Sequence, residues 1–280
     1  MKKTNKTKTI ILIILLSILC IVLIGFLIAF ICGVIPIWSF NVGSYKVSNH
    51  LAYEEIYDRN IQSIEVDSTL GDIEILPSND DNIHLSIYSD DHLFEVNDSN
   101  SSLVVKFQEE EGFHFQLSRT KDLVRLYVPE DCDILFGLAS DSGDVEVMDF
   151  SNASFDISVD MGEVAIDSCD TLDIESDMGD VRIGTVRELD AVLDLGNLEV
   201  TSITESLSIE ADMGKVSLDE VHLLSDSTIT LSLGDLDIKQ LSNAYVDAKT
   251  DLGNIDVENN DRNAPYTLSI KNDMGDVTIG

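Results

Sequence analysis

The chain has 280 residues, of which 17 are Lys or Arg and 52 are Asp or Glu, so its formal net charge is -35, while 44% of the residues are hydrophobic. This excess of negative charge excludes nucleic acid and anionic lipid headgroups as partners for the bulk of the chain, because one polyanion releases no counterions from another. The hydrophobic content is too high for a wholly disordered acidic chain. Cationic molecules and divalent metal ions remain possible binding partners.

The first segment carries the signal of a membrane anchor. Residues 1–9 contain four lysines, and residues 10–35 form an uncharged apolar run that ends before Pro36. At about 1.5 Å per residue, a helix over this run more than spans a hydrocarbon core of about 30 Å. A cleaved signal peptide fits less well, since its apolar region is shorter and a small-x-small site follows it. We therefore predict a cytoplasmic basic tail at 1–9, a single transmembrane helix at 10–35 and an extracytoplasmic remainder, because basic flanks stay inside.

A linker or stalk is predicted for residues 36–55, followed by one extracytoplasmic β domain over residues 56–280. The first part of this domain, up to about residue 135, holds strand-like segments without a clean repeat. A single early copy of the later repeat, TLGDIEI at 69–75, indicates that this part forms irregular first coils of the same fold. Inserted hairpins are expected around Asp98 and Glu110.

Regular repeats fill residues 141–280. The pattern acid-apolar-Gly-polar-apolar-x-apolar recurs there, and DMGDVRI at 177–183 is a representative copy. Successive glycines lie 17 to 22 residues apart, which is the spacing of a repeat architecture. Each glycine is predicted to turn a corner of its coil, because glycine tolerates positive φ. These turn glycines are Gly143, Gly162, Gly179, Gly196, Gly214, Gly234, Gly253 and Gly275.

Apolar residues alternate with polar ones on both sides of each repeat glycine. This period of two predicts two strands per coil, each with one buried face. A unit this short buries that face only by stacking on the next coil along the chain, so we predict an all-β fold, a parallel β-solenoid of 17–22 residues per coil. The sequence leaves the handedness of the coil open, although right-handed crossovers are the more common. The residues directly before the glycines, including Met161, Met178 and Met213, are expected in the core. The stack is expected to end at Ile279 without a polar cap.

Several segments resemble a known family. They are the strand and PSNDD sequence at 64–82, the LYVPEDCDI segment at 126–134 and the SGDVEV and MGDV repeats that follow. They resemble the bacterial putative adhesin domain, a β-solenoid of unknown function in cell-envelope proteins that include LiaG-like and LiaX-like envelope-stress proteins. The resemblance covers about residues 56–280 and implies an extracytoplasmic module. It supplies no catalytic residues.

An acidic residue recurs two positions before the repeat glycine. Stacking would place these carboxylates in a ladder with rungs about 4.8 Å apart, where neighbouring charges repel. Two explanations are open: each Asp accepts backbone N–H groups of its own turn, or adjacent carboxylates bind Ca²⁺, which takes 6–8 oxygen ligands. The tandem nonapeptide of Ca²⁺-binding solenoids is missing, which favours the first. The candidate Ca²⁺ ligands are Asp160, Asp177, Asp194, Asp212, Asp251 and Asp273.

The sequence contains no catalytic or nucleotide-binding motif, and its five histidines are scattered. Cys132 and Cys169 could form one disulfide or remain as buried thiols. We therefore expect no enzyme, and no cofactor other than Ca²⁺.

These features predict a membrane-anchored β-solenoid that acts as a non-enzymatic binding, adhesion or envelope-stress module outside the cell membrane. The expected partners are the lipid bilayer, through residues 10–35, and a cationic peptide, a protein or a cell-wall component, but not nucleic acid. The first alternative is a structural spacer or a Ca²⁺-responsive assembly module. The second is a polysaccharide-acting enzyme, since paired carboxylates can hydrolyse glycosides.

Overall fold

The computed structural model describes most of the chain from residue 46 onward, namely residues 46–90, 93–99, 101–108 and 120–280. These residues form 19 strands and no helix. The basic tail predicted at 1–9, the transmembrane helix predicted at 10–35 and the hairpin expected around Glu110 lie outside the described residues. Within those residues, no helix has the length and apolar character needed to cross a bilayer.

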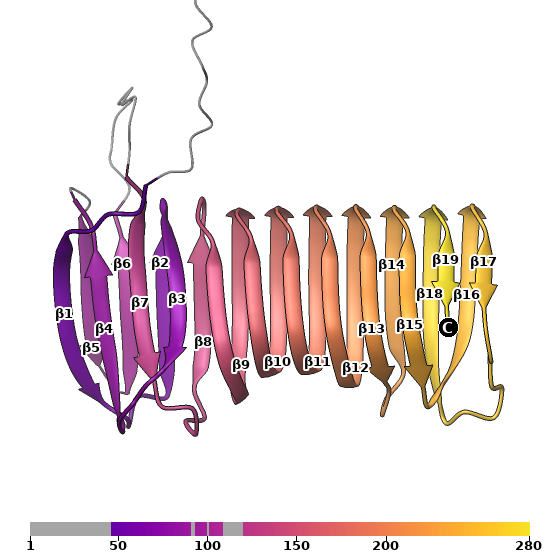
Figure 1. The fold of residues 1–280 in the computed structure, drawn as a ribbon, viewed down its shortest axis with the longest axis horizontal. Coiled ribbons are helices and arrows are strands. Elements are labelled where there is room, and N and C mark those ends of the chain that lie inside the picture. The colour runs from indigo at the N-terminus through magenta and orange to yellow at the C-terminus, as the bar shows by residue number, and fades with distance from the viewer. Residues whose placement is uncertain (1–45, 91–92, 100, 109–119) are drawn as a thin grey trace, which may run out of the picture. The chain divides into compact units, whose positions relative to one another are not determined.

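Four long strands form the regular middle of the fold (Figure 1). Each runs from one repeat glycine towards the next and bends midway, so that its first part lies in one layer and its second part in another; we call these the first and second layers. Val164 lies opposite Val145 in the preceding coil and Val181 in the following one, and all three strands run parallel. This solenoid-like stacking in register agrees with the sequence prediction. The strands are β9 (Val145–Met161), β10 (Val164–Met178), β11 (Val181–Leu195) and β12 (Leu198–Met213).

Apolar side chains from every coil fill the space between the two layers. Phe155, Ile157 and Val159 in the second part of β9 point inward, and Val164 and Ile166 do so after the corner; all five are at most 3% exposed. Burial of each such side chain stabilises the fold by about 1.5–3 kcal/mol. The alternation of the sequence therefore decides which face of each strand is buried, and the neighbouring coils supply the packing surface.

The position directly before the repeat glycine is exposed, so the prediction that its methionines lie in the core is wrong. Met161, Met178 and Met213 are 46–48% exposed. Inward-facing positions end three residues before the glycine and resume two residues after it, because the intervening residues form the corner and do not follow the strand alternation. The backbone still stacks there, since the Gly162 N–H donates to the Met178 carbonyl of the next coil (N···O 3.1 Å).

Antiparallel strands extend the N-terminal end of the stack. In the first layer the order is β1, β4, β7, β3, β9, which is antiparallel as far as β7 and parallel from there. In the second layer the order is β5, β6, β2, β8, β9, and only β5 and β6 are antiparallel, forming the hairpin beside Asp98. The strands are β1 (Leu51–Asp58), β2 (Ser63–Ser68), β3 (Gly71–Pro77), β4 (Asn82–Tyr88), β5 (Phe94–Ser99), β6 (Ser102–Phe107), β7 (Asp122–Val128) and β8 (Leu135–Ser140).

The linker predicted for residues 36–55 is too long at its C-terminal end. Residues Leu51–Asp58 form β1 and pair with β4 at the edge of the first layer. Six of the eight side chains of β1 are exposed, Ile56 by 60%, while Tyr53 is half-buried and Tyr57 is buried. The strand therefore lacks the apolar alternation by which sequence reasoning recognises a half-buried strand.

The last two coils exchange places relative to their order in the chain. β18 pairs in parallel with both β14 and β16, and β19 pairs in the same way with β15 and β17. The coil of β18 and β19 is therefore an inner coil, and the preceding coil of β16 and β17 is outermost (Figure 1). The expectations of stacking in sequence order and of an uncovered end at Ile279 are both wrong. The strands are β13 (Val216–His222), β14 (Ser227–Leu233), β15 (Leu236–Ser242), β16 (Ala244–Leu252), β17 (Ile255–Val257), β18 (Tyr266–Met274) and β19 (Val277–Ile279).

The composition of the two coils explains this exchange. At two paired inward positions the inner coil carries Leu268 and Ile270, where the outer coil carries the smaller Val246 and Ala248. The more apolar coil thus gains a neighbour on both sides. The outer edge is closed by Asn260, whose side chain accepts from the Val246 N–H (2.9 Å) and donates to the Val246 carbonyl (3.0 Å). These bonds occupy part of an edge that would otherwise be a template for another strand.

Candidate functional site

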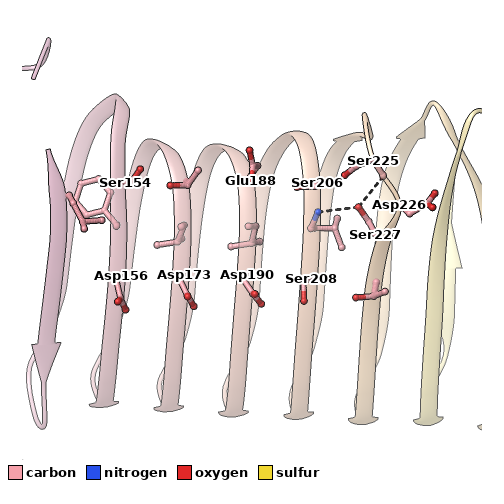
Figure 2. Close-up of a pocket in the computed structure, with 17 residues that line it drawn as sticks. Ser154, Asp156, Asp173, Glu188, Asp190, Ser206, Ser208, Ser225, Asp226 and Ser227 are labelled. Carbon is pink, nitrogen blue, oxygen red and sulfur yellow. Dashed lines mark hydrogen bonds between the residues drawn. The ribbon is translucent and has the colours of Figure 1, made fainter. Parts of the chain in front are cut away.

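A groove of about 550 Å³ crosses the outer face of the second layer, over strands β8 to β12 and β14 (Figure 2). Its floor includes the outward position six residues before each repeat glycine. Asp156, Asp173 and Asp190 occupy this position in three successive coils and lie in register. Ser208 and Thr228 continue the row in the next two coils. The parallel stacking therefore turns one residue per repeat into a continuous polar row.

A second polar row lies alongside, at the position eight residues before the glycine. Its members are also paired in register from coil to coil, and they are Ser154, Thr171, Glu188 and Ser206. At the end of the groove the Ser227 hydroxyl accepts from the Leu207 N–H (3.2 Å), a bond drawn in Figure 2. The groove thus offers carboxylates and hydroxyl groups in two parallel rows.

The groove is strongly anionic. Of the described residues that line it, five are Asp or Glu and none is Lys, Arg or His. Burial, and then the carboxylates of Asp190 and Asp156, raise the pKa of Asp173 above its ordinary value of 3.8. Neighbouring rungs lie about 4.8 Å apart, so a cation placed between them would relieve repulsion that the protein does not itself neutralise.

The arginine beside the groove is already engaged. The Arg187 guanidinium donates to Asp170 (Nε to Oδ1, 2.6 Å) and to Glu205 (Nη1 to Oε2, 2.8 Å), and it also contacts Glu188. The hydrogen bond from Arg187 lowers the pKa of Asp170 below its ordinary value. This arginine, midway along β11, therefore compensates three carboxylates, and the Asp156, Asp173 and Asp190 row keeps its charge.

The six aspartates predicted as Ca²⁺ ligands lie on the surface, one in each coil. Two have side-chain partners: Ser232 Oγ donates to Asp212 (2.9 Å), and Lys271 Nζ donates to Asp273 (2.7 Å). Across the described residues, no group of three or more His, Cys, Asp or Glu is arranged to hold a metal ion. The Ca²⁺ site stays a prediction. The six residues are Asp160, Asp177, Asp194, Asp212, Asp251 and Asp273.

Backbone acceptors occur at a different position from the one predicted. Where the residue directly after the repeat glycine is Asp or Asn, its side chain accepts the backbone N–H of the equivalent residue in the neighbouring coil. The Asn197 N–H donates to Asp180 Oδ1, and the Lys215 N–H donates in turn to Asn197 Oδ1, both at 3.0 Å. The six candidate aspartates make no such bond within their own turn among the described residues. Short Asp and Asn side chains therefore connect neighbouring coils. The sequence of a single repeat does not show these hydrogen bonds, because each needs two coils.

The repeat glycines lie at the corner, six of the eight have a positive φ, and they admit the neighbouring backbone. Gly214 has a φ of 147°, and a Cβ there would lie 1.7 Å from the Gly196 carbonyl oxygen. Gly143 and Gly234 lack a positive φ, yet a Cβ at either would lie 2.0 or 1.7 Å from a neighbouring carbonyl oxygen. Close approach of the coils is thus the requirement that all three share.

The two described cysteines are unpaired and buried. Burial, with a smaller contribution from the Asp170 carboxylate, raises the pKa of Cys169 to about 12. Cys132 and Cys169 are therefore neither a disulfide nor a reactive thiol pair. The described histidines are dispersed: His84 Nε2 lies 2.9 Å from an Asp80 carboxylate oxygen, and His222 contacts Ser242.

The family model for the Toastrack domain, DUF4097, matches residues 61–280. The chain belongs to the Toastrack family. This confirms the resemblance to an adhesin-like domain of unknown function that the repeats indicated. No curated protein matches the chain.

Similar chains among solved structures are also described as adhesins or binding proteins. A putative adhesin from Parabacteroides distasonis is 13% identical (TM-score 0.48), and the match covers 84% of this chain and 100% of that one. A putative adhesin from Bacteroides fragilis is 18% identical (TM-score 0.42), with 84% and 99% covered. A putative lipid binding protein from Parabacteroides distasonis is 9% identical (TM-score 0.34), with 81% and 94% covered. At these identities nothing about a ligand carries over to this Toastrack domain.

Sequence reasoning missed the groove of this Toastrack domain. It weighed the acidic positions next to the glycine and left out the row formed by Asp156, Asp173 and Asp190. The signal was present, because the row appears once the repeats are aligned on their glycines and the outward positions are compared. Leu135, which pairs in register with Ser154, and Ser225 also line the groove.

Proposed function

We propose that this Toastrack domain is a non-enzymatic binding module, held outside the cell membrane by the apolar segment at residues 10–35, and that its acidic groove binds a basic part of a peptide or protein. The observation that carries the proposal is the groove: two polar rows, five carboxylates and no cation among the described lining residues. A ligand with regularly spaced Lys or Arg side chains would place a charge near each rung.

The same geometry argues against catalysis. Glycoside hydrolysis by paired carboxylates needs one acid and one base or nucleophile whose surroundings differ, so that their pKa values separate. Asp156, Asp173 and Asp190 repeat one environment in successive coils, and the outer face around them is an open surface of strands. Adhesion and envelope-stress signalling need only binding and no catalysis.

Binding is tested with oligolysine of about ten residues added to the full chain in phosphatidylcholine nanodiscs, with empty discs as the reference. Changing Asp156, Asp173 and Asp190 together to Asn should weaken binding at least about tenfold and flatten its salt dependence. The control changes three exposed carboxylates that lie away from the groove: Glu146→Gln, Asp167→Asn and Glu220→Gln. Equal losses in both triple variants would show that net charge alone binds the probe, and the groove proposal would then be wrong.

Membrane placement is tested separately. A reporter enzyme that is active only outside the cytoplasm, fused after Gly280, should be active in cells, and deletion of residues 1–35 should abolish its activity and release the protein from membranes. Activity of a reporter that works only in the cytoplasm would contradict the proposed orientation.

A further inference from the structure

An uninterrupted row of apolar side chains lies exposed along the glycine corner of seven coils. They are 42–63% exposed. Each pairs in register with the next along the stack, including across the exchanged coils. We call this row the corner ridge, and in spatial order it consists of Met161, Met178, Leu195, Met213, Leu233, Met274 and Leu252.

The fold itself does not require apolar side chains on the ridge. The backbone of this position makes the stacking bonds, as between the Gly196 N–H and the Met213 carbonyl (3.1 Å), while the side chain extends outward. Ser142 holds the same position before Gly143, so a small polar residue is compatible with the corner. Seven exposed Met and Leu side chains in one line therefore form a contiguous apolar strip of the kind that marks an interaction site.

Carboxylates border the ridge on both sides. Each ridge residue ends its strand in the second layer, and the residue before it is Asp in every ridge coil except that of Ser232. The residue after the glycine begins the return to the first layer. It is acidic in four of the seven ridge coils and otherwise Asn or Lys; in chain order the residues are Glu163, Asp180, Asn197, Lys215, Asp235, Asn254 and Asp276. Arg182 contacts Glu163 and Asp180, while Asp160, Asp177 and Asp194 have no ion pair with a described Lys or Arg.

This arrangement selects the chemistry of the partner. A second copy of the chain, or an anionic lipid surface, would bring more negative charge against these carboxylates as it covered the ridge. A partner with an apolar stripe bordered by Lys or Arg would cover the methionines and pair the carboxylates on both sides. Methionine suits such a surface, since its flexible thioether adapts to different apolar partners.

The spacing favours a helix as the partner. Ridge rungs repeat about every 4.8 Å, and an α-helix returns to the same face about every 5.4 Å, whereas an extended strand does so only about every 6.6 Å. Seven rungs match a helix of about 20 residues. We propose that the corner ridge binds a cationic amphipathic helix, whose apolar stripe lies along the ridge between its two rows of carboxylates. This goes beyond the proposed function, since it adds a second surface for a basic partner and specifies the shape of that partner.

The test uses a synthetic amphipathic helix of about 20 Leu and Lys residues, a scrambled peptide of the same composition, and oligolysine. Binding is measured to the full chain in phosphatidylcholine nanodiscs, with binding to empty discs subtracted. The ridge variant carries Met178→Gln, Leu195→Gln and Met213→Gln. The matched control carries three other exposed apolar residues changed to Gln, Ile56, Met148 and Leu224, which are 60%, 37% and 46% exposed.

We expect the amphipathic helix to bind the unmodified chain at least about tenfold more tightly than the scrambled peptide. The ridge variant should lose that preference and keep its affinity for oligolysine, while the control variant keeps both. Equal binding of the helix and the scrambled peptide, with oligolysine still bound through the groove, would overturn the ridge proposal and leave the proposed function standing. If no basic probe binds, both fail. If the ridge substitutions change only self-association or lipid contact, a second copy or the bilayer covers the ridge, and the proposal is wrong.

Discussion

Replacing Gly214 by Ala tests the close stacking of the coils most directly. A Cβ at this position would lie 1.7 Å from the Gly196 carbonyl oxygen, a separation that real Cβ atoms essentially never show, and the φ of 147° is itself strained for a residue with a side chain. The strained backbone costs about 1–3 kcal/mol. The two coils must also separate, which weakens the bonds between them from the Gly196 N–H to the Met213 carbonyl (3.1 Å) and from the Leu198 N–H to the Lys215 carbonyl (2.9 Å).

Each weakened bond costs about 0.5–1.5 kcal/mol, so Gly214→Ala should lower the free energy of unfolding by about 2–6 kcal/mol. That is a large part of the roughly 5–15 kcal/mol that stabilises a typical domain. The measurement is urea unfolding of the full chain in detergent, followed by far-ultraviolet circular dichroism. Its matched control is Gly137→Ala in β8, where a Cβ would meet only the Glu65 Cγ at 3.8 Å. A loss below about 1 kcal/mol for Gly214→Ala, or an equal loss for both variants, would refute the stacking argument.

Three further predictions concern the edge, the groove and the metal. Asn260→Ala should free the Val246 backbone at the outer edge and promote concentration-dependent association, seen by light scattering, whereas the exposed Asn263→Ala should not. Asp173→Asn should raise the melting temperature at pH 7 and have no effect once the pH is below 3.8, because a carboxyl whose folded pKa is raised destabilises the fold only while it is ionised; a gain that persists at low pH would contradict this. Millimolar Ca²⁺ should leave the melting temperature unchanged relative to chelator if the surface aspartates hold no metal, and an increase that Asp177→Asn and Asp194→Asn remove together would instead support the Ca²⁺ prediction.

The sequence predicted the stacking because the stacking depends on local pattern. Alternation set the buried face of each strand, and the glycine period set the length of each coil, since both features repeat in every unit. The error at Met161, Met178 and Met213 came from extending the alternation by one step into the corner. Two exposed residues in succession occur there, and a hydrophobic side chain gives no sign that it lies on the outside of a turn.

Neither the exchanged coils nor the groove could be obtained from the repeat alone. The pairing order depends on which coil buries more apolar surface when it has a neighbour on both sides. The apolar side chains to be compared are Leu268 and Ile270 in one coil and Ala248 and Ile255 in the other. The connection at residues 258–265 is long enough to permit either order, because a step between adjacent strands is only about 4.8 Å. Sequence pattern fixes the units of such a fold, while differences among the units fix their arrangement.

β18 and β19 lie between strands that precede them in the chain, and this affects the order in which the domain folds during synthesis. At roughly 5–20 residues per second, synthesis reaches Met274 about one to three seconds after it completes β17 at Val257. During that interval β14 and β15 have an open edge that β16 and β17 can occupy, although the finished protein requires them one place further out. Folding of this end of the domain therefore includes either a delay before β16 and β17 dock or their displacement from β14 and β15 by β18 and β19. Residues 266–280 consequently act as an insert that completes the end of the domain from within, and deleting them would bring β16 and β17 against a surface that they do not normally contact.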